Sequence, residues 1–303
     1  MTSNATPTLT LLAATDLSAP ARQAAQRAAQ LAAQLGADLT LMHAMPPGAA
    51  GELRAWLGEA VHERLREQAC HTLQAQAADL QRASGVTVAW RLAERGVLDA
   101  VDEAAAADDA ALVVLGARGA GFMRRMVLGT TSERLLRRTQ RPLLVVRTLP
   151  HEPYRRALLA IDFSPWSAQV VAMARRFAPQ ARLTLCHAWR VPFEEKLRFA
   201  GVDDGLIERF RHDARLRAEG ELRALARQAG LAGGDWDARV VEGEASQRLV
   251  EQELACDADL VVLGKHGQSA AEDLLLGSVT KHVLAEGRSD VLVATLEGAP
   301  AAA

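Results

Sequence analysis

Cysteine is scarce in this 303-residue sequence, which contains only Cys70, Cys186 and Cys256. The three are far apart and form no Cys-x-x-Cys pair, so we expect neither a disulfide framework nor a zinc site. Such sparse use fits a reducing compartment. The N-terminal stretch MTSNATPTLTLLAAT has no basic segment ahead of its short apolar run, so we expect no secretory signal and a cytoplasmic protein.

The sequence also lacks an excess of one charge and any long apolar run. Its formal net charge is -2, which gives no electrostatic basis for general binding to nucleic acid or to a membrane surface. No apolar run approaches the ~20 residues that a membrane-spanning helix needs. Nearly half of the residues are hydrophobic (49%), so two domains of ordinary size would each bury a core.

Five sequence blocks occur twice, in the same order and at a nearly constant offset. LTLLAATDLS near the start corresponds to RALLAIDFS near the middle, LTLMHA to LTLCHA, DAALVVLGARG to DADLVVLGKHG, and PLLVV to DVLVA. The fifth matched feature is a glycine, Gly129 in the first copy and Gly277 in the second. The sequence therefore predicts a duplicated domain, with units at residues 1–149 and 150–303 and a boundary in the Pro-containing segment near His151.

Each copy alternates short apolar runs with segments of helical periodicity. In the first copy we expect strands at 8–14, 38–44, 86–92, 111–116 and 143–147, and helices at 18–35, 52–83, 98–107 and 131–139. Ser18 is a good N-cap and Gly36 a good C-terminal cap for the first helix. The runs LVVLG and LLVV are continuously apolar, which is typical of parallel strands buried on both faces.

These patterns predict an α/β fold made of two tandem, doubly wound, five-stranded parallel-sheet domains of Rossmann-like type. Periodicity does not fix the strand order, and we assume the common order 3-2-1-4-5. In such a sheet a ligand binds at the carboxyl ends of the strands, between strands 1 and 4. Strand 1 ends at Asp16 or Asp162 and strand 4 at Gly116 or Gly264, so both features should meet at one crevice in each copy.

A glycine-rich loop follows strand 4 in both copies. The loops read GARGAGFMRRMVLGTTS and GKHGQSAAEDLLLGSVT, which share the spacing Gly-x-x-Gly-(x9)-Gly-Ser/Thr. Glycines let the backbone turn and approach a ligand closely, and the helix that follows offers N–H groups and its positive dipole end to an anion. Thr130 and Ser278 add hydroxyl donors, and Arg118 and Lys265 are placed to reach a phosphate.

This loop, after LVVLG and before a helix and a VLVV-like strand, resembles the universal stress protein family. The resemblance covers the whole chain as two family domains in tandem. It implies binding of ATP, with or without Mg²⁺, in which the glycines and Ser/Thr hold the phosphates and the aspartate contacts the adenosine part. The candidate nucleotide-binding residues are Asp16, Gly116, Arg118, Gly119, Gly129, Thr130 and Thr131 in the first copy, and Asp162, Gly264, Lys265, Gly267, Gly277, Ser278 and Val279 in the second.

Family members pair through their fifth strands, so the resemblance also implies an internal pseudo-dimer of the two halves and leaves a homodimer open. The two copies differ, however. The first loop contains Arg124 and Arg125 where the second contains Glu272 and Asp273, and the last strand of the second copy starts at Asp290 instead of a proline. Acidic residues near a polyphosphate are unfavourable, so we expect the two sites to differ in affinity.

Structural explanations compete with these assignments. The glycines would serve equally as turn and cap residues, although their repetition in both copies favours a phosphate-type site. Asp16 and Asp162 would serve as N-caps of the helices that follow them. His43 and His187 end strand 2 of their copies, where we expect packed histidines rather than ligands.

Sequence motifs of enzymes are missing. There is no Gly-x4-Gly-Lys-Ser/Thr loop, no Gly-x-Ser-x-Gly elbow, no His-Glu-x-x-His, and no Gly-x-Gly-x-x-Gly after strand 1. We therefore expect neither catalytic nor metal-binding residues. The favoured function is an ATP-binding, stress-linked regulatory or binding module. The alternatives are a nucleotide-free scaffold that works through protein contacts and, less favoured, a weak ATPase or another ATP-using enzyme.

Overall fold

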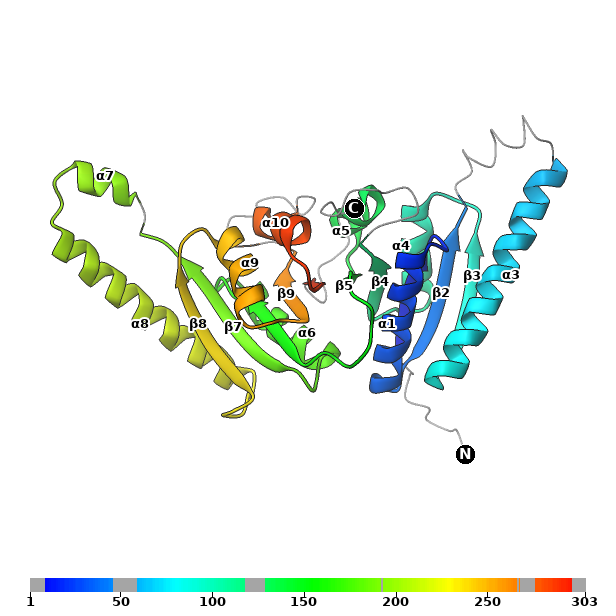
Figure 1. The fold of residues 1–303 in the computed structure, drawn as a ribbon, viewed down its shortest axis with the longest axis horizontal. Helices are drawn as coiled ribbons and strands as arrows, with labels where there is room; N and C mark the ends of the chain where they lie inside the picture. Colours follow the sequence, from blue (N-terminus) through cyan, green and yellow to red (C-terminus); the bar gives the residue numbers. More distant parts are fainter. Residues whose placement is uncertain are drawn as a thin grey trace. The chain divides into compact units, whose positions relative to one another are not determined.

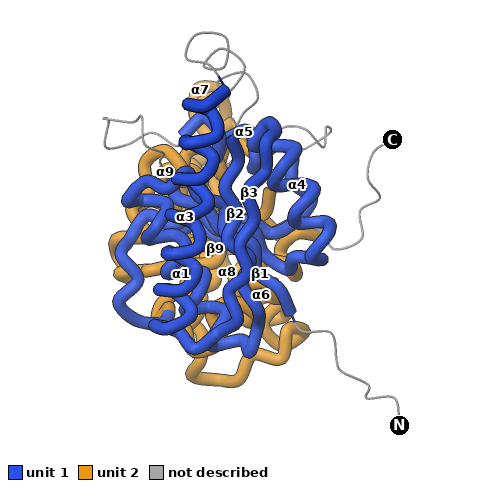
Figure 2. Tube along the Cα trace, turned by 90° about the vertical axis from the view of Figure 1, so that its right-hand side faces the viewer, with its two compact units in different colours: residues 1–153, 290–303 blue, residues 154–289 orange. Residues whose placement is uncertain are grey.

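The computed structural model describes residues 9–45, 59–117, 129–191, 193–265, 267 and 276–295. Along this part of the chain, strands and helices alternate (Figure 1). Contacts between residues divide the chain into two compact units. Unit 1 holds the chain up to Pro153 together with the segment that starts at Asp290, and unit 2 holds Tyr154–Ser289 (Figure 2).

Unit 1 contains the first sequence copy together with the last segment of the second. Its elements are β1 (Thr10–Thr15), α1 (Ala19–Leu35), β2 (Asp38–Ala44), α3 (Glu59–Ser84), β3 (Val88–Ala93), α4 (Val97–Ala107), β4 (Leu112–Gly116), α5 (Thr130–Arg138), β5 (Leu143–Val146) and, from the C-terminal part, β10 (Asp290–Ala294). The strands lie in the order β3-β2-β1-β4-β5-β10. The pairs from β3 to β5 are parallel, which confirms both the fold class and the assumed order 3-2-1-4-5.

Local sequence explains the ends of α1. Ser18 is the N-cap, its side chain accepts a hydrogen bond from the Ala21 amide, and Gly36 ends the helix in the left-handed region at φ 61°. Both residues act as the sequence predicts. The buried face of α1 is made mostly of alanines, which lets the helix lie close to the sheet. In Figure 2, α1 and α3 cover one face of the strands of unit 1 and α4 covers the other.

Unit 2 repeats this arrangement. Its elements are β6 (Arg156–Ala160), α6 (Trp166–Phe177), β7 (Arg182–Trp189), α7 (Glu194–Phe199), α8 (Asp204–Gln228), β8 (Trp236–Glu242), α9 (Ala245–Ala255), β9 (Leu260–Gly264) and α10 (Ser278–Glu286). Its strands follow the order β8-β7-β6-β9, with parallel pairs. The short helix α7 was not expected from the sequence. It has no buried residue, so it carries no apolar periodicity to reveal it (Figure 1).

The central strands form the core of each unit. Every residue of β4 and β5 is buried, and so are the first four residues of β9. The continuously apolar runs LVVLG and LLVV therefore lie between two layers, as predicted. The expected helix at 52–83 is described from Glu59 onward, and its earlier residues lie outside the described part of the chain.

Strand β10 comes from the second sequence copy but groups with unit 1 because it pairs with β5. The pairing is antiparallel, with Leu292 opposite Leu144 and Val291 opposite Val145. Both strands are buried, and all their residues except Asp290 are apolar, so the ladder adds apolar burial to main-chain hydrogen bonds. This is the fifth-strand pairing implied by the family resemblance, found here inside one chain.

A buried carboxylate fixes the start of β10. Oδ1 of Asp290, a fully buried residue, accepts hydrogen bonds from the amides of Arg147 (2.8 Å) and Thr148 (3.0 Å) and from the Thr148 hydroxyl (3.0 Å). Its Oδ2 lies 3.4 Å from Nε of Arg27, which is also buried, on α1. Asp290 therefore connects β10 to the end of β5 and to α1.

A second buried carboxylate holds the turn between α10 and β10. Oε1 of Glu253, on α9, accepts hydrogen bonds from the amides of Arg288 (2.7 Å) and Ser289 and from the Ser289 hydroxyl. Glu253 is 3% exposed, so water does not replace these bonds easily. Gly287 allows the close approach, because a β carbon there would lie 2.8 Å from Oε2 of Glu253 and 2.7 Å from the Val283 carbonyl oxygen.

Candidate functional site

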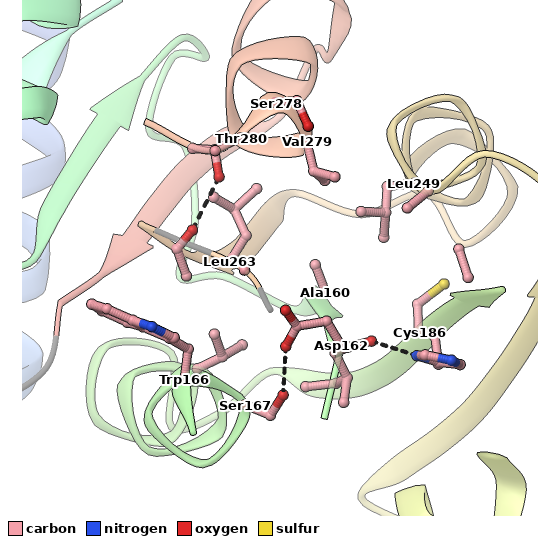
Figure 3. Close-up of a pocket in the computed structure, with 18 residues that line it drawn as sticks. Ala160, Asp162, Trp166, Ser167, Cys186, Leu249, Leu263, Ser278, Val279 and Thr280 are labelled. Carbon is pink, nitrogen blue, oxygen red and sulfur yellow. Dashed lines mark hydrogen bonds between the residues drawn. The ribbon is translucent and has the colours of Figure 1, made fainter. Parts of the chain in front are cut away.

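Unit 2 has a pocket at the carboxyl ends of its strands, where the sequence places the site. Its volume is about 280 Å³. The wall is formed by the ends of β6, β7 and β9 and by the starts of α6, α9 and α10 (Figure 3). The lining residues are Ala160, Ile161, Asp162, Trp166, Ser167, Val170, Cys186, His187, Ala188, Ala245, Leu249, Leu263, Gly264, Gly267, Gly277, Ser278, Val279 and Thr280.

The pocket brings together six of the seven residues that the sequence proposes for the second copy. Asp162 lies two residues after β6, Gly264 ends β9 and Gly267 follows it. The remaining three, Gly277, Ser278 and Val279, lie at the start of α10. Apolar side chains such as Leu249 and Val170 line other parts of the wall. A cavity with polar groups at the glycine loop and apolar walls elsewhere suits a ligand that has both an anionic and a hydrophobic part.

The seventh residue, Lys265, lies next to the pocket but is not in its lining. It is 4% exposed, and its carbonyl oxygen accepts a hydrogen bond from the Gly277 amide at 3.1 Å. The same bond joins the Gly129 amide to the Ala117 carbonyl (2.9 Å) in the first copy. These bonds close the base of each loop, so the third glycine of the motif uses its own N–H within the protein.

The donors left for an anion therefore come one to three residues later. In α10 the first intrahelical donor is the Lys281 amide, which bonds to the Gly277 carbonyl. The amides of Ser278, Val279 and Thr280 precede it and have no partner within the helix, as in the first turn of any helix. These amides and the positive end of the helix dipole lie at the edge of the pocket.

Asp162 is held in a defined orientation. Its Oδ1 accepts a hydrogen bond from the Ser164 amide (3.0 Å). It also accepts one from the Ser167 hydroxyl (3.1 Å), which Figure 3 shows. Its Oδ2 lies where Gly267 has no side chain, 3.1 Å from the position that a β carbon there would occupy. A side chain at this position would push the carboxylate aside by a few tenths of an ångström, so the glycine leaves it room.

The helix-cap alternative for the two aspartates is wrong. In the first copy Ser18 caps α1. The Asp16 carboxylate accepts a hydrogen bond at 3.0 Å from the amide of Ser18, which precedes the first residue of the helix. In the second copy the N-cap position of α6 is Pro165, and Asp162 makes the matching bond to Ser164. Both aspartates therefore order the loop after the first strand rather than the helix itself.

Unit 1 reproduces the frame of this site. Gly116 ends β4, Gly129 is the N-cap of α5, and Thr130 and Thr131 begin that helix with exposed side chains. Asp16 is exposed at the end of β1. Two of the proposed residues, Arg118 and Gly119, lie outside the described residues, as do the loop residues Arg124, Arg125, Glu272 and Asp273.

Comparison with known proteins identifies the family. The sequence profile of the universal stress protein family matches residues 8–147 and 153–295. The chain belongs to the universal stress protein family. A universal stress protein of Mycobacterium tuberculosis is 32% identical over 202 residues, an alignment that spans 62% of this chain and 62% of that relative. One from Mycolicibacterium smegmatis is 29% identical over 301 residues and spans 93% of this chain and 96% of the relative.

Solved universal stress protein structures share the fold. One from Archaeoglobus fulgidus aligns with a TM-score of 0.71 at 16% sequence identity, covering 94% of this chain and 98% of the other. A putative universal stress protein from Pseudomonas aeruginosa aligns with a TM-score of 0.60 at 19% identity, covering 94% and 92%. The tandem arrangement of two universal stress protein domains is therefore established.

Several residues at the site were missed by sequence reasoning. The Thr280 hydroxyl donates to the Gly264 carbonyl (3.0 Å), and the Ser132 hydroxyl donates to the Gly116 carbonyl (3.1 Å). Each bond joins the end of a strand to the start of the helix after the loop. Aligning the two copies would have revealed this pair, since both have a hydroxyl residue three positions after the third glycine.

The paired histidines have a structural contact in both copies. Nδ1 of His43 lies 2.7 Å from the Thr15 carbonyl oxygen, and Nδ1 of His187 lies 2.8 Å from the Ile161 carbonyl oxygen. A carbonyl only accepts hydrogen bonds, so each Nδ1 must carry the proton. The histidines thus brace the residue before each aspartate, in agreement with the expected packing role, and His187 also lines the pocket.

Cys186 lines the pocket as an unreactive thiol. It is 1% exposed, and burial raises its pKa from 9.0 to about 12. Because the folded state retains this proton more tightly than the unfolded state, the stability contributed by the protonated thiol falls as the pH rises from 9.0 towards 12.

We expect iodoacetamide at pH 8 to modify the half-buried Cys70 of the native protein and to spare Cys186. Only the thiolate is nucleophilic, and a pKa of about 12 leaves very little of it at this pH. Mass spectrometry of peptides from native and urea-unfolded samples measures both rates. Equal labelling of the two thiols in the native protein would contradict the buried environment of Cys186.

Within the described part of the chain, no group of three or more His, Cys, Asp and Glu side chains is arranged to hold a metal ion. Among the same residues, no helix has both the length and the apolar character to cross a bilayer.

Proposed function

We propose that this universal stress protein binds ATP, with or without Mg²⁺, in the pocket of unit 2, and that it acts as a cytoplasmic regulatory or binding module without catalysis. The observation that carries the proposal is the convergence of Asp162, the glycine loop and the first amides of α10 on one pocket. The amides and Ser278 would hold the phosphates, and the held carboxylate would accept a hydrogen bond from the adenosine part.

The pocket supports binding better than catalysis. Hydrolysis of ATP needs a group that positions or activates water, whereas the hydroxyl of Ser167 donates to Asp162 and Cys186 is a buried thiol with a raised pKa.

We propose the equivalent site of unit 1, built on Asp16, Gly116, Arg118, Gly119, Gly129, Thr130 and Thr131, as a second nucleotide site. We also retain the boundary between residues 149 and 150 as the limit between the two sequence copies.

Calorimetric titration of the nucleotide-stripped protein with ATP tests the proposal. The Gly129→Val and Gly277→Val variants place a branched side chain at the start of α5 or α10, where the phosphates would lie. We expect binding by the wild type and loss of the corresponding site in each variant. No heat of binding at millimolar ATP would refute the proposal and leave a nucleotide-free scaffold that works through protein contacts. ATP turnover above background would instead favour a weak ATPase.

A smaller change tests the geometry around the carboxylate. We expect Gly267→Ala to weaken ATP binding by unit 2 about tenfold, or ~1.4 kcal/mol, because its methyl group must displace Oδ2 of Asp162. Gly233→Ala is the matched control, since a β carbon there meets no atom within 4 Å. Both variants are measured in the Gly129→Val background, so that only one site titrates. Equal affinity of the two variants would show that Asp162 does not contact the nucleotide.

A further inference from the structure

The aspartates of the two copies are held differently. Both accept a hydrogen bond from the amide two residues ahead, at 3.0 Å in each copy. Asp162 accepts a second bond from the Ser167 hydroxyl at 3.1 Å, and that serine is 3% exposed in the first turn of α6 (Figure 3). The matching position in the first copy is Ala21, which has no hydroxyl to donate.

The second bond limits the rotation of the Asp162 carboxylate. The donors of these two bonds are a main-chain amide and a side chain packed on a helix, so neither is free to move. With Oδ1 fixed in this way, Oδ2 is directed to the space above Gly267 inside the pocket. Asp162 is also half-buried whereas Asp16 is exposed, so its interactions are less weakened by water.

The residue that follows Asp162 gives additional support. Phe163 packs against His187 with ring centroids 4.3 Å apart, and His187 is itself bonded to the Ile161 carbonyl. The corresponding residue of the first copy is Leu17, which has no aromatic ring. The loop before α6 is therefore braced on both sides of the carboxylate.

We propose that Ser167 is a positioning residue that orients Asp162 for the adenosine part of the nucleotide, and that the lack of its hydroxyl weakens nucleotide binding by unit 1. This inference rests on the proposed function. A carboxylate already held in the binding orientation loses less conformational freedom when a ligand binds. The affinity for the nucleotide is therefore higher than with a freely rotating carboxylate. This effect opposes the one expected from the loop sequences, in which Glu272 and Asp273 disfavour a polyphosphate in the second copy.

The test is titration of the full-length protein with ATP, adenosine and inorganic triphosphate in the Gly129→Val background. We expect Ser167→Ala to weaken ATP and adenosine about tenfold, because a hydrogen bond to a charged group is lost, and to leave triphosphate unchanged. Ser246→Ala, on α9 and outside the pocket lining, is the control and should change none of the three.

A double-mutant cycle separates positioning from direct contact. If Ser167 acts through Asp162, Asp162→Ala and the double variant Asp162→Ala/Ser167→Ala should bind ATP equally, because neither retains a carboxylate for the serine to orient. Additive losses would overturn the positioning role, and so would an equal loss for triphosphate, which would indicate general damage to the pocket. Wild-type affinity in Ser167→Ala would overturn this inference alone. A wild type that does not bind ATP would overturn the proposed function together with it.

The reciprocal change adds the hydroxyl to the first copy. In the Gly277→Val background, where only unit 1 is intact, we expect Ala21→Ser to tighten ATP binding about fivefold. Unchanged affinity would overturn the claim that the missing hydroxyl weakens this half.

Discussion

Replacing Asp290 with asparagine should lower the free energy of unfolding of unit 1 by about 3 kcal/mol, because it removes a buried negative charge that faces the buried Arg27 guanidinium. The change keeps the size of the side chain and one acceptor oxygen for Arg147 and Thr148. Its effect should therefore concentrate on the ion pair. Hydrogen exchange of the β5 and β10 amides measures it, since these amides report on local opening of the ladder.

The controls for this prediction use the same chain. Asp79→Asn breaks an exposed ion pair with Arg82 on α3 and should change stability by less than about 0.5 kcal/mol. The double variant Arg27→Met/Asp290→Asn removes both buried charges and should regain part of the loss. Unaltered protection of β10 in Asp290→Asn would mean that the apolar ladder alone holds the strand.

Replacing Glu253 with alanine should destabilise unit 2 by about 3 kcal/mol. The change removes the acceptor for the Arg288 and Ser289 amides, and a buried donor without a partner costs ~1–3 kcal/mol. The Ser289 hydroxyl also lies 2.8 Å from the Ala258 carbonyl oxygen, so it keeps an acceptor. Urea unfolding followed with hydrogen exchange in α9 and α10 measures the loss.

Glu253→Gln is the informative comparison because its amide oxygen still accepts these bonds. We expect it to lose less than about 1 kcal/mol. If glutamine and alanine were equally destabilising, the negative charge rather than the acceptor would hold the turn. If neither variant had an effect, the Arg288–Ser289 segment would have to find other partners when the glutamate is removed.

The features that the sequence predicts correctly are those encoded by neighbouring residues or repeated in both copies. Continuous apolar runs identified β4 and β5, and Ser18 and Gly36 marked the ends of α1. The meeting of Asp162 with the glycine loop followed from strand order, since topology alone brings the ends of strands 1 and 4 together. The duplication strengthened each of these inferences, because both copies had to satisfy them.

The interactions that escaped prediction depend on distant partners or on side-chain direction. Asp290 bonds to residues 143 and 142 positions earlier, and Glu253 bonds 35 and 36 positions ahead. No periodicity encodes such pairs. Because Lys265 is positively charged and lies in the glycine motif, we predicted that it reaches a phosphate. The residue is buried beside the pocket and is not in its lining. The sequence alone does not show the direction in which a side chain points.

Strand β10 shows that the duplicated sequence copies and the compact units of the structure do not coincide. The duplicated sequence ends its second copy with β10, whereas that strand completes the sheet of unit 1. A gene fragment that encodes only the first copy would leave β5 as an apolar edge strand with unpaired amides and carbonyls. In the full chain, β10 pairs with β5 and is part of the same polypeptide. Its effective concentration near β5 therefore does not fall when the protein is diluted.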